Sequence, residues 1–161
     1  MPDLVTHLCS ALLPKAITGG RHVGPFAVGV VLPDLLARVP GLMVGGVRRL
    51  GVAVPESTGV LFEIFHMPVG IVLACLLLAR AFVAEQRAAV FGWLCAGGFL
   101  HLALDVLQDH HGEGYYLLFP LSTFRWELGW IGPEATVPWA PWLALVTALA
   151  WAIRLGVRRR R

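Results

Sequence analysis

Charged residues are scarce in this chain. Only 14% of its 161 residues are Asp, Glu, Lys or Arg, and 57% are hydrophobic, whereas a soluble globular domain carries about 25% charged residues. The mean hydropathy is +0.72. These values argue against a soluble enzyme or binding domain and predict a membrane protein. The length, residues 1–161, is that of a single domain.

Cysteine is scarce as well. Cys9, Cys75 and Cys95 are odd in number, widely spaced and set among apolar residues, which argues against a disulfide framework and against a Cys-x-x-Cys zinc site. The start MPDLVTHLCS has no Lys or Arg, so no cleavable signal peptide is predicted. The net charge is +3, but aromatic residues are not interleaved with the basic ones, and we expect no nucleic-acid partner.

Long apolar segments are what the chain has instead. A helix that crosses a bilayer needs about 20 predominantly apolar residues, and three segments reach that length: residues 59–82, 88–107 and 135–157. Two shorter apolar segments flank the turn signal Thr18-Gly19-Gly20, and they predict a helical hairpin over residues 4–37.

The remaining stretches predict connections. Residues 39–55, punctuated by Gly and Pro, predict a loop or interfacial segment, and residues 109–134 predict a long polar loop. The expected fold class is therefore all-α: an integral membrane helical bundle with an N-terminal short helical hairpin and about three transmembrane helices.

Basic residues are unevenly divided between the two ends of these helices. If the hairpin and the spans alternate in direction, nine of the thirteen Lys and Arg residues fall on one side together with one acid, Glu85. The other side receives four basic residues and nine acids. Because Lys and Arg accumulate in cytoplasmic loops, we expect the C-terminal tail Arg158–Arg161 to be cytoplasmic and the 109–134 loop to face outward.

Ionisable residues nevertheless interrupt the apolar segments, and an ionisable residue within a membrane indicates a functional site. Asp34 stands in the sequence LPDLLA. Residues three or four apart share one face of a helix, and three acid–histidine pairs have this spacing: Asp3 with His7, Glu63 with His66, and His101 with Asp105.

The expected topology brings these residues to one level of the membrane. Imidazole and carboxylate groups are ligands of zinc, and also of iron and manganese. We therefore predict one divalent metal, zinc first with iron or manganese as alternatives, held by His7, Asp34, His66, His101 and Asp105. Glu63 or Asp105 is predicted to act as general base or to orient a histidine. His22 is expected to be unrelated to the site, and His110 and His111 are expected to be solvated in the polar loop.

The order of motifs along the chain resembles a known family. Thr6-His7, then Leu32–Asp34 (LPD), then His66 opening a membrane helix, then His101–Asp105 (HLALD) precede the segment LLFPLSTFRWELG. This order resembles the membrane-bound metal-dependent hydrolases of the YdjM type, which are LexA-binding proteins associated with the inner membrane. The resemblance covers residues 4 to 130. It implies a helical membrane fold, a divalent-metal site, hydrolase activity and a prokaryotic inner membrane.

Two departures accompany this resemblance. The family's PDxD motif has Leu36 in place of its second acid, and the HRGxTHS motif is reduced to FEIFHMP, which keeps only His66. Glu63 stands nearby and would substitute as a ligand. The resemblance carries over five residues: His7, Asp34, His66, His101 and Asp105.

The leading hypothesis is a membrane-bound metal-dependent hydrolase with an outward-facing site, acting on a lipid or lipid-linked ester or phosphoester. Membrane lipids and a small-molecule or lipid substrate are the expected partners. The main alternative is a non-catalytic membrane protein whose polar cluster holds helices together or binds a metal without chemistry, although interhelical polar contacts average only about 0.6 kcal/mol. A metal or proton conduit and a haem-binding bundle are further alternatives.

Overall fold

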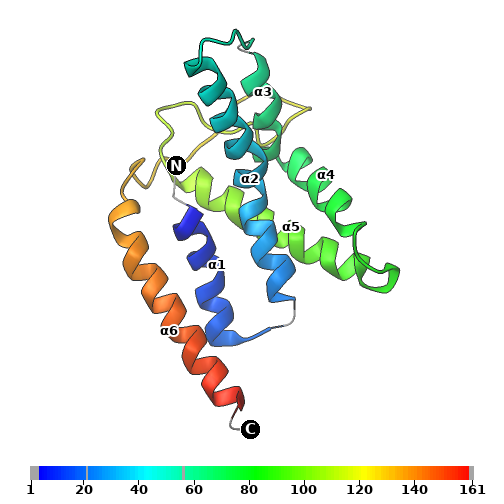
Figure 1. Ribbon diagram of the computed structural model, residues 1–161, viewed down its shortest axis with the longest axis vertical. Coiled ribbons are helices and arrows are strands. Elements are labelled where there is room, and N and C mark those ends of the chain that lie inside the picture. The colour runs from blue at the N-terminus through cyan, green and yellow to red at the C-terminus, as the bar shows by residue number, and fades with distance from the viewer. Residues whose placement is uncertain (1–3, 21, 56, 160–161) are drawn as a thin grey trace.

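The fold is helical nearly throughout (Figure 1). The computed structural model describes residues 4–20, 22–55 and 57–159. The elements in chain order are α1 (Leu4–Thr18), α2 (Val23–Arg49), α3 (Ser57–Glu63), the 3-10 helix η1 (Ile64–His66), α4 (Pro68–Ala79), α5 (Ala84–Leu107), the 3-10 helix η2 (Val137–Trp139) and α6 (Ala140–Arg159). Within the described residues, β-type pairing is limited to two isolated bridges. The predicted all-α class is confirmed.

Three helical stretches are long and apolar enough to cross a membrane: Val23–Arg49, Ala84–Leu107 and Val137–Arg159. The second and third correspond to the predicted spans 88–107 and 135–157. Along the third stretch most apolar side chains face outward, among them Leu149 and Ile153, and Ala140 and Thr147 are the buried residues of α6. Such a surface suits lipid, and the chain is a membrane protein.

The prediction for the second helix was wrong. It was expected to end at Ala37 and to be followed by a loop over 39–55, but α2 continues to Arg49 in spite of Pro33 and Pro40. Membrane helices tolerate proline and glycine because neighbouring helices re-satisfy the freed backbone groups and no water competes for them. Asp34 therefore lies near the middle of a long helix and not at a helix end.

The predicted span 59–82 is also not one helix. η1 ends at His66, Met67 is extended with φ −112° and ψ 146°, and α4 begins at Pro68. Proline disfavours the helical conformation in the residue before it, so the Met67-Pro68 step breaks the apolar run. With 12 residues, α4 is too short to cross a bilayer alone. The break leaves His66 at the junction of two helices.

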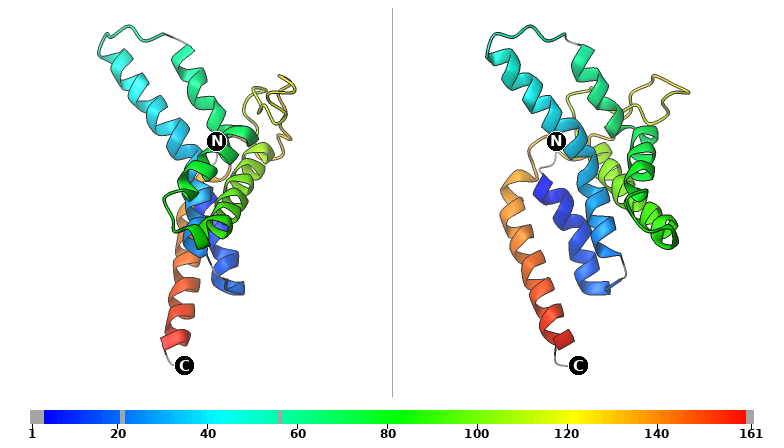
Figure 2. Two further views of the ribbon diagram at one scale, coloured as in Figure 1. Left: turned by 90° about the vertical axis from the view of Figure 1, so that its right-hand side faces the viewer. Right: turned by 45° about the vertical axis from the view of Figure 1, so that its right-hand side comes forward.

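Close packing of α2 against α5 forms the centre of the bundle. α4 packs on α5, and α1 packs between α2 and α6 (Figures 1 and 2). Glycines permit the central approach: a Cβ atom at Gly29 would overlap the carbonyl oxygen of Leu94, and one at Gly97 would overlap the carbonyl oxygen of Phe26. Small residues let the backbones of membrane helices come together in this way.

We expect Gly97→Ala to lower the free energy of unfolding by about 1–3 kcal/mol, the usual range for overpacking, because the added methyl group would meet the backbone of Phe26 and Val30. Gly92→Ala in the same helix is the matched control, since a Cβ atom there has nothing within 4 Å. Thermal unfolding in detergent measures both variants. Equal midpoints for the two would contradict the close approach of α2 and α5.

Candidate metal centre

The structure brings together five ionisable side chains from four segments. His7 comes from α1, Asp34 from α2, His66 from the end of η1, and His101 and Asp105 from the last turns of α5. All five are buried, with His7, His101 and Asp105 at 0% exposure. The i,i+4 spacing of His101 and Asp105 places both on the face of α5 that meets the other helices.

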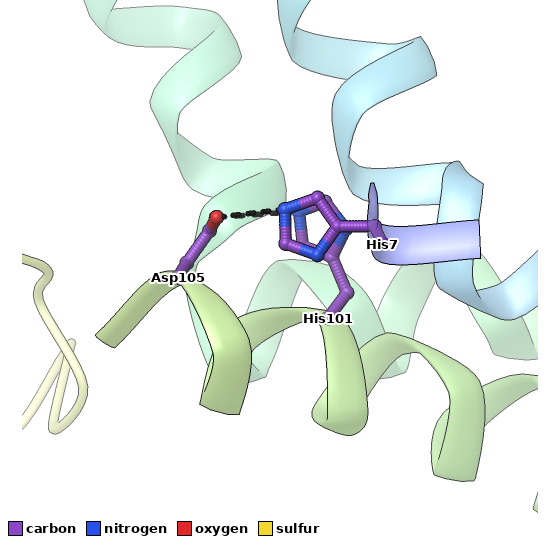
Figure 3. A group of neighbouring side chains, drawn as sticks. All are labelled: His7, His101 and Asp105. Atoms are coloured by element: carbon purple, nitrogen blue, oxygen red, sulfur yellow. Dashed lines mark ion pairs between the residues drawn. The ribbon is translucent and has the colours of Figure 1, made fainter. Parts of the chain in front are cut away.

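Asp105 and two imidazoles form the first half of the cluster. His7 Nε2 lies 3.1 Å from Asp105 Oδ1, and His101 Nε2 lies 3.3 Å from Asp105 Oδ2. The rings of His7 and His101 are stacked, with centroids 4.1 Å apart, and both point toward Asp105 (Figure 3). One ligand atom from each of these three residues could hold a metal ion.

Asp34 forms the second half. Its Oδ1 atom lies 3.4 Å from His66 Nε2 and 3.9 Å from His101 Nε2, and these three residues make a second group that could hold an ion. The halves are joined by His101, which belongs to both, and by the 3.8 Å separation of His66 Nε2 from Asp105 Oδ2. Arg38 Nε lies 3.0 Å from the same Asp34 oxygen.

Short separations within the cluster do not amount to hydrogen bonds. Within the described part of the chain, nine buried nitrogen and oxygen atoms of these five side chains have no partner in hydrogen-bonding geometry. A buried polar atom without a partner is unfavourable, and more so inside a bilayer. These nitrogen and oxygen atoms lie close together without hydrogen-bonding one another. A cation bound between them would satisfy them.

The distances fit one metal ion. Bonds of about 2.0–2.2 Å from zinc to nitrogen and oxygen ligands separate neighbouring ligand atoms by roughly 3–4 Å, and the paired atoms lie 3.1–3.9 Å apart. One imidazole nitrogen binds one ion, so His101 cannot complete both groups at once. Leu36, where the resemblance expects a second acid, packs against the apolar core and supplies no ligand.

A cavity of about 510 Å³ adjoins the cluster at His66, and its volume is within the usual range for small-molecule sites, about 300–1,000 Å³. Its wall is formed by α2, the α3–η1 segment and the segment 108–136, and its polar lining includes Arg38, Glu63, His110, Tyr115 and Arg125. Glu63 is exposed on this wall and belongs to neither ligand group. Asp3, paired with His7 in the sequence, lies outside the described residues.

Sequence reasoning missed a group of side chains in the segment 108–136. His110 was expected to be solvated, but its Nε2 atom lies 2.9 Å from the hydroxyl oxygen of Tyr115, and its Nδ1 atom lies 3.1 Å from the carbonyl oxygen of Gln108. Because a carbonyl oxygen only accepts, Nδ1 carries the proton and the Tyr115 hydroxyl donates to Nε2. His111 is exposed, as expected, and His22 lies against Trp93 at the start of α2, away from the cluster.

Tyr115 connects this group to the metal centre. Its ring stacks on His66 with centroids 6.0 Å apart, and 8% of its surface is exposed. Burial raises the pKa of the Tyr115 phenol, and the negative charge of Asp105 raises it further, so the hydroxyl stays protonated. The one signal in the sequence was a concentration of polar residues after Asp105, which does not reveal that this segment folds back over the cluster.

Glu127 holds the segment in place. Its carboxylate accepts hydrogen bonds from the backbone N–H of His110 at 2.9 Å and of Gly112 at 3.0 Å, and it lies 3.5 Å from His110 Nδ1. Backbone bonds from Leu128 to the Val106 carbonyl and from Ile131 to the Leu107 carbonyl tie the segment to the end of α5. Carbonyl groups that a helix leaves unpaired at its end are thereby satisfied.

Comparisons with protein-family models, with characterised proteins and with solved structures find no match to this chain. The resemblance to the YdjM-type hydrolases therefore stays a prediction.

We expect Glu127→Ala to loosen the segment 108–115, because hydrogen bonds to a charged group contribute about 1.5–3 kcal/mol. Hydrogen–deuterium exchange of peptides from this segment should become faster, while exchange in α2 should not change. Glu134→Ala, at an exposed position of the same connection, is the control. Exchange at residues 108–115 that matches the parent protein would show that Glu127 does not hold the segment.

Proposed function

We propose that this protein is a membrane-embedded metal-dependent hydrolase. The observation that carries the proposal is the convergence of five side chains, whose nine buried nitrogen and oxygen atoms lack hydrogen-bond partners among the described residues. These residues are His7, Asp34, His66, His101 and Asp105, and His66 lies on the wall of a cavity. Three imidazoles and two carboxylates form a ligand set that suits zinc best, with iron and manganese as alternatives.

The chemistry follows from the position of the cluster beside the cavity. A divalent metal, when bound, lowers the pKa of a coordinated water toward about 7 and so makes it nucleophilic at neutral pH. Each carboxylate oxygen of Asp105 lies close to an imidazole nitrogen, and we assign Asp105 the role of a metal ligand. Glu63 is exposed on the cavity wall, which favours it as the general base.

The reaction proposed is hydrolysis of an ester or phosphoester. The water oxygen bonds to the ester carbon or phosphorus, and the bond to the leaving alcohol breaks. Glu63 takes a proton from the water, and the departing alcohol oxygen receives a proton in turn, so that Glu63 ends as it began. Tyr115 stacks on His66 at the cavity wall and, held by His110, restricts how a substrate lies against the metal.

A metal site without chemistry is the second candidate. It is favoured by Leu36, which packs in the apolar core where the resembling family has its second acid. Both candidates predict a bound metal, and activity toward esters and phosphoesters separates them.

We expect His101→Ala to abolish metal binding while the protein still inserts, because a catalytic zinc site has only about three protein ligands and losing a polar group leaves the helix more apolar. Metal stoichiometry in detergent, by elemental analysis, measures the effect. His22→Asn is the control. Asparagine suits the left-handed backbone of His22, whose φ is 60°, and that residue is about 18 Å from Asp34 along the axis of α2.

Equal metal content in the parent, His101→Ala and His22→Asn would refute the metal site, and helix cohesion would then be the preferred account. Metal lost from His101→Ala, with no hydrolysis by the parent of any ester or phosphoester tested, would leave a metal-binding protein without chemistry.

In the proposed orientation, the metal centre lies inside a prokaryotic inner membrane, and its cavity faces the outer side. Basic residues near the opposite ends of the helices, Arg80, Arg87, Arg154 and Arg158 among them, support a cytoplasmic C-terminus. The basic residues on the side of the metal centre are fewer: Arg38, Arg48, Arg49 and Arg125.

We expect a reporter fused after the last residue to be active only in the cytoplasm, and one inserted at the exposed Gly112 to be active only outside. The two positions are the controls for each other. Activity of the C-terminal fusion outside the cytoplasm would reverse the proposed orientation.

A further inference from the structure

The second half of α2 and the whole of α3 form an arm, residues 35–63, which extends beyond the other helices (Figures 1 and 2). Several of its apolar side chains are exposed, among them Leu42 at 76%, Met43 at 67% and Leu61 at 69%. On the other side of the cavity, the loop tip, residues 117–124, exposes Leu121 at 92% and Phe124 at 69%. Apolar surface of this extent marks an interaction site.

Helix length indicates what covers the arm. α2 has 27 residues, which at about 1.5 Å per residue makes about 40 Å, whereas the hydrocarbon core of a bilayer is about 30 Å thick. Arg154 donates to the carbonyl groups of Lys15 and Ala16 at the end of α1, next to the start of α2, and marks one membrane surface there. About 20 residues of α2 then cross the hydrocarbon, as far as Met43.

With this placement, Asp34 lies near the middle of the bilayer. The part of the arm that follows Asp34, as far as Met43, lies in the leaflet beyond the bilayer middle. Arg48 and Arg49 then stand at the level of the lipid headgroups, where basic side chains are favoured. α1 has 15 residues and α4 has 12. Each therefore covers only part of the bilayer, and the N-terminal end of each helix lies at the level of the metal centre. Beyond that level, α2, α3 and the segment 108–136 surround the cavity, and lipid fills the remaining space.

We propose that the arm and the loop tip lie in the leaflet on the side of the metal centre, so that the cavity opens sideways into lipid and receives the headgroup of a phosphate-bearing membrane lipid. Hydrolysis of this lipid rests on the proposed function, but the lipid contact itself does not.

Two guanidinium groups on the cavity wall favour phosphate. Arg38 comes from α2 and Arg125 from the segment 108–136, and the planar guanidinium fork matches phosphate oxygens. The Arg125 guanidinium is held over the Tyr116 ring at 4.5 Å and by the Glu113 carbonyl at 3.1 Å. Two of the cavity's carboxylates are engaged: Glu113 lies 3.6 Å from Arg125, and Asp109 accepts from the backbone N–H of His111 at 2.7 Å.

Photo-crosslinking in phosphatidylcholine nanodiscs tests the immersion of the arm. A benzophenone amino acid is placed at Leu42, at Leu121 and, as control, at Gln86, which is exposed at the far end of α5. We expect phosphatidylcholine adducts by mass spectrometry at Leu42 and Leu121 and few at Gln86. Adducts at Leu42 and Leu121 no more frequent than at Gln86 would overturn the inference.

The headgroup assignment has its own measurement. Binding of phosphatidic acid to the full chain, by native mass spectrometry in competition with phosphatidylcholine, should weaken about tenfold in Arg125→Gln, a typical loss for one charge-assisted contact. Arg80→Gln, at the opposite membrane surface, is the control and should bind as the parent does. Equal binding by Arg125→Gln and the parent would overturn the phosphate assignment.

These outcomes separate the inference from the proposed function. Lipid adducts and phosphatidic acid binding in a protein that contains no metal would sustain the inference and end the hydrolase proposal. One metal ion per chain together with hydrolysis of an ester or phosphoester, but without adducts at Leu42 and Leu121, would do the reverse.

Discussion

The close packing of α2 against α5 is the constraint on which the candidate metal centre depends. Gly97 of α5 meets the backbone of Phe26 and Val30 of α2. One helical turn further along, Asp34 follows Val30 on α2 and His101 follows Gly97 on α5, each by four residues. The separation of the two backbones at the glycine therefore sets the separation of the ligands. A wider crossing would leave Asp34 out of reach of the imidazoles that α5 and η1 supply.

The ionisable cluster in turn explains the less regular parts of the chain. His66 is brought to the cluster by the break at Met67-Pro68, and His7 by the short α1, which begins at the level of the metal centre. The segment 108–136 covers the cluster with Tyr115 and is fastened to the end of α5. Each of these features would be unfavourable alone, because a bilayer offers no water to unpaired polar groups. Together they bring the buried polar atoms into one cluster that a cation would satisfy.

Sequence reasoning succeeded where the physical signal is local. The apolar runs at 88–107 and 135–157 identified two of the three spanning stretches, and i,i+4 spacing selected His101 and Asp105. It failed over residues 39–49, because Gly and Pro were interpreted as they would be in water, whereas residues 50–55 do form a connection. Over residues 59–82 the sequence did contain a signal for a helix break, because Pro68 restricts the backbone of Met67. The apolar residues on both sides nevertheless led to the prediction of one continuous span.

The sequence by itself determined that the chain enters a membrane as helices and that histidine and carboxylate groups interrupt it at helical spacing, because hydropathy and the helical period are properties of neighbouring residues. Only the tertiary structure decided that His7, Asp34 and His66 meet the pair on α5, that Tyr115 and His110 adjoin them, and that the cavity has an apolar rim. Those outcomes depend on how closely α2 approaches α5 and on how the segment 108–136 folds back, and these are contacts between residues far apart in the chain.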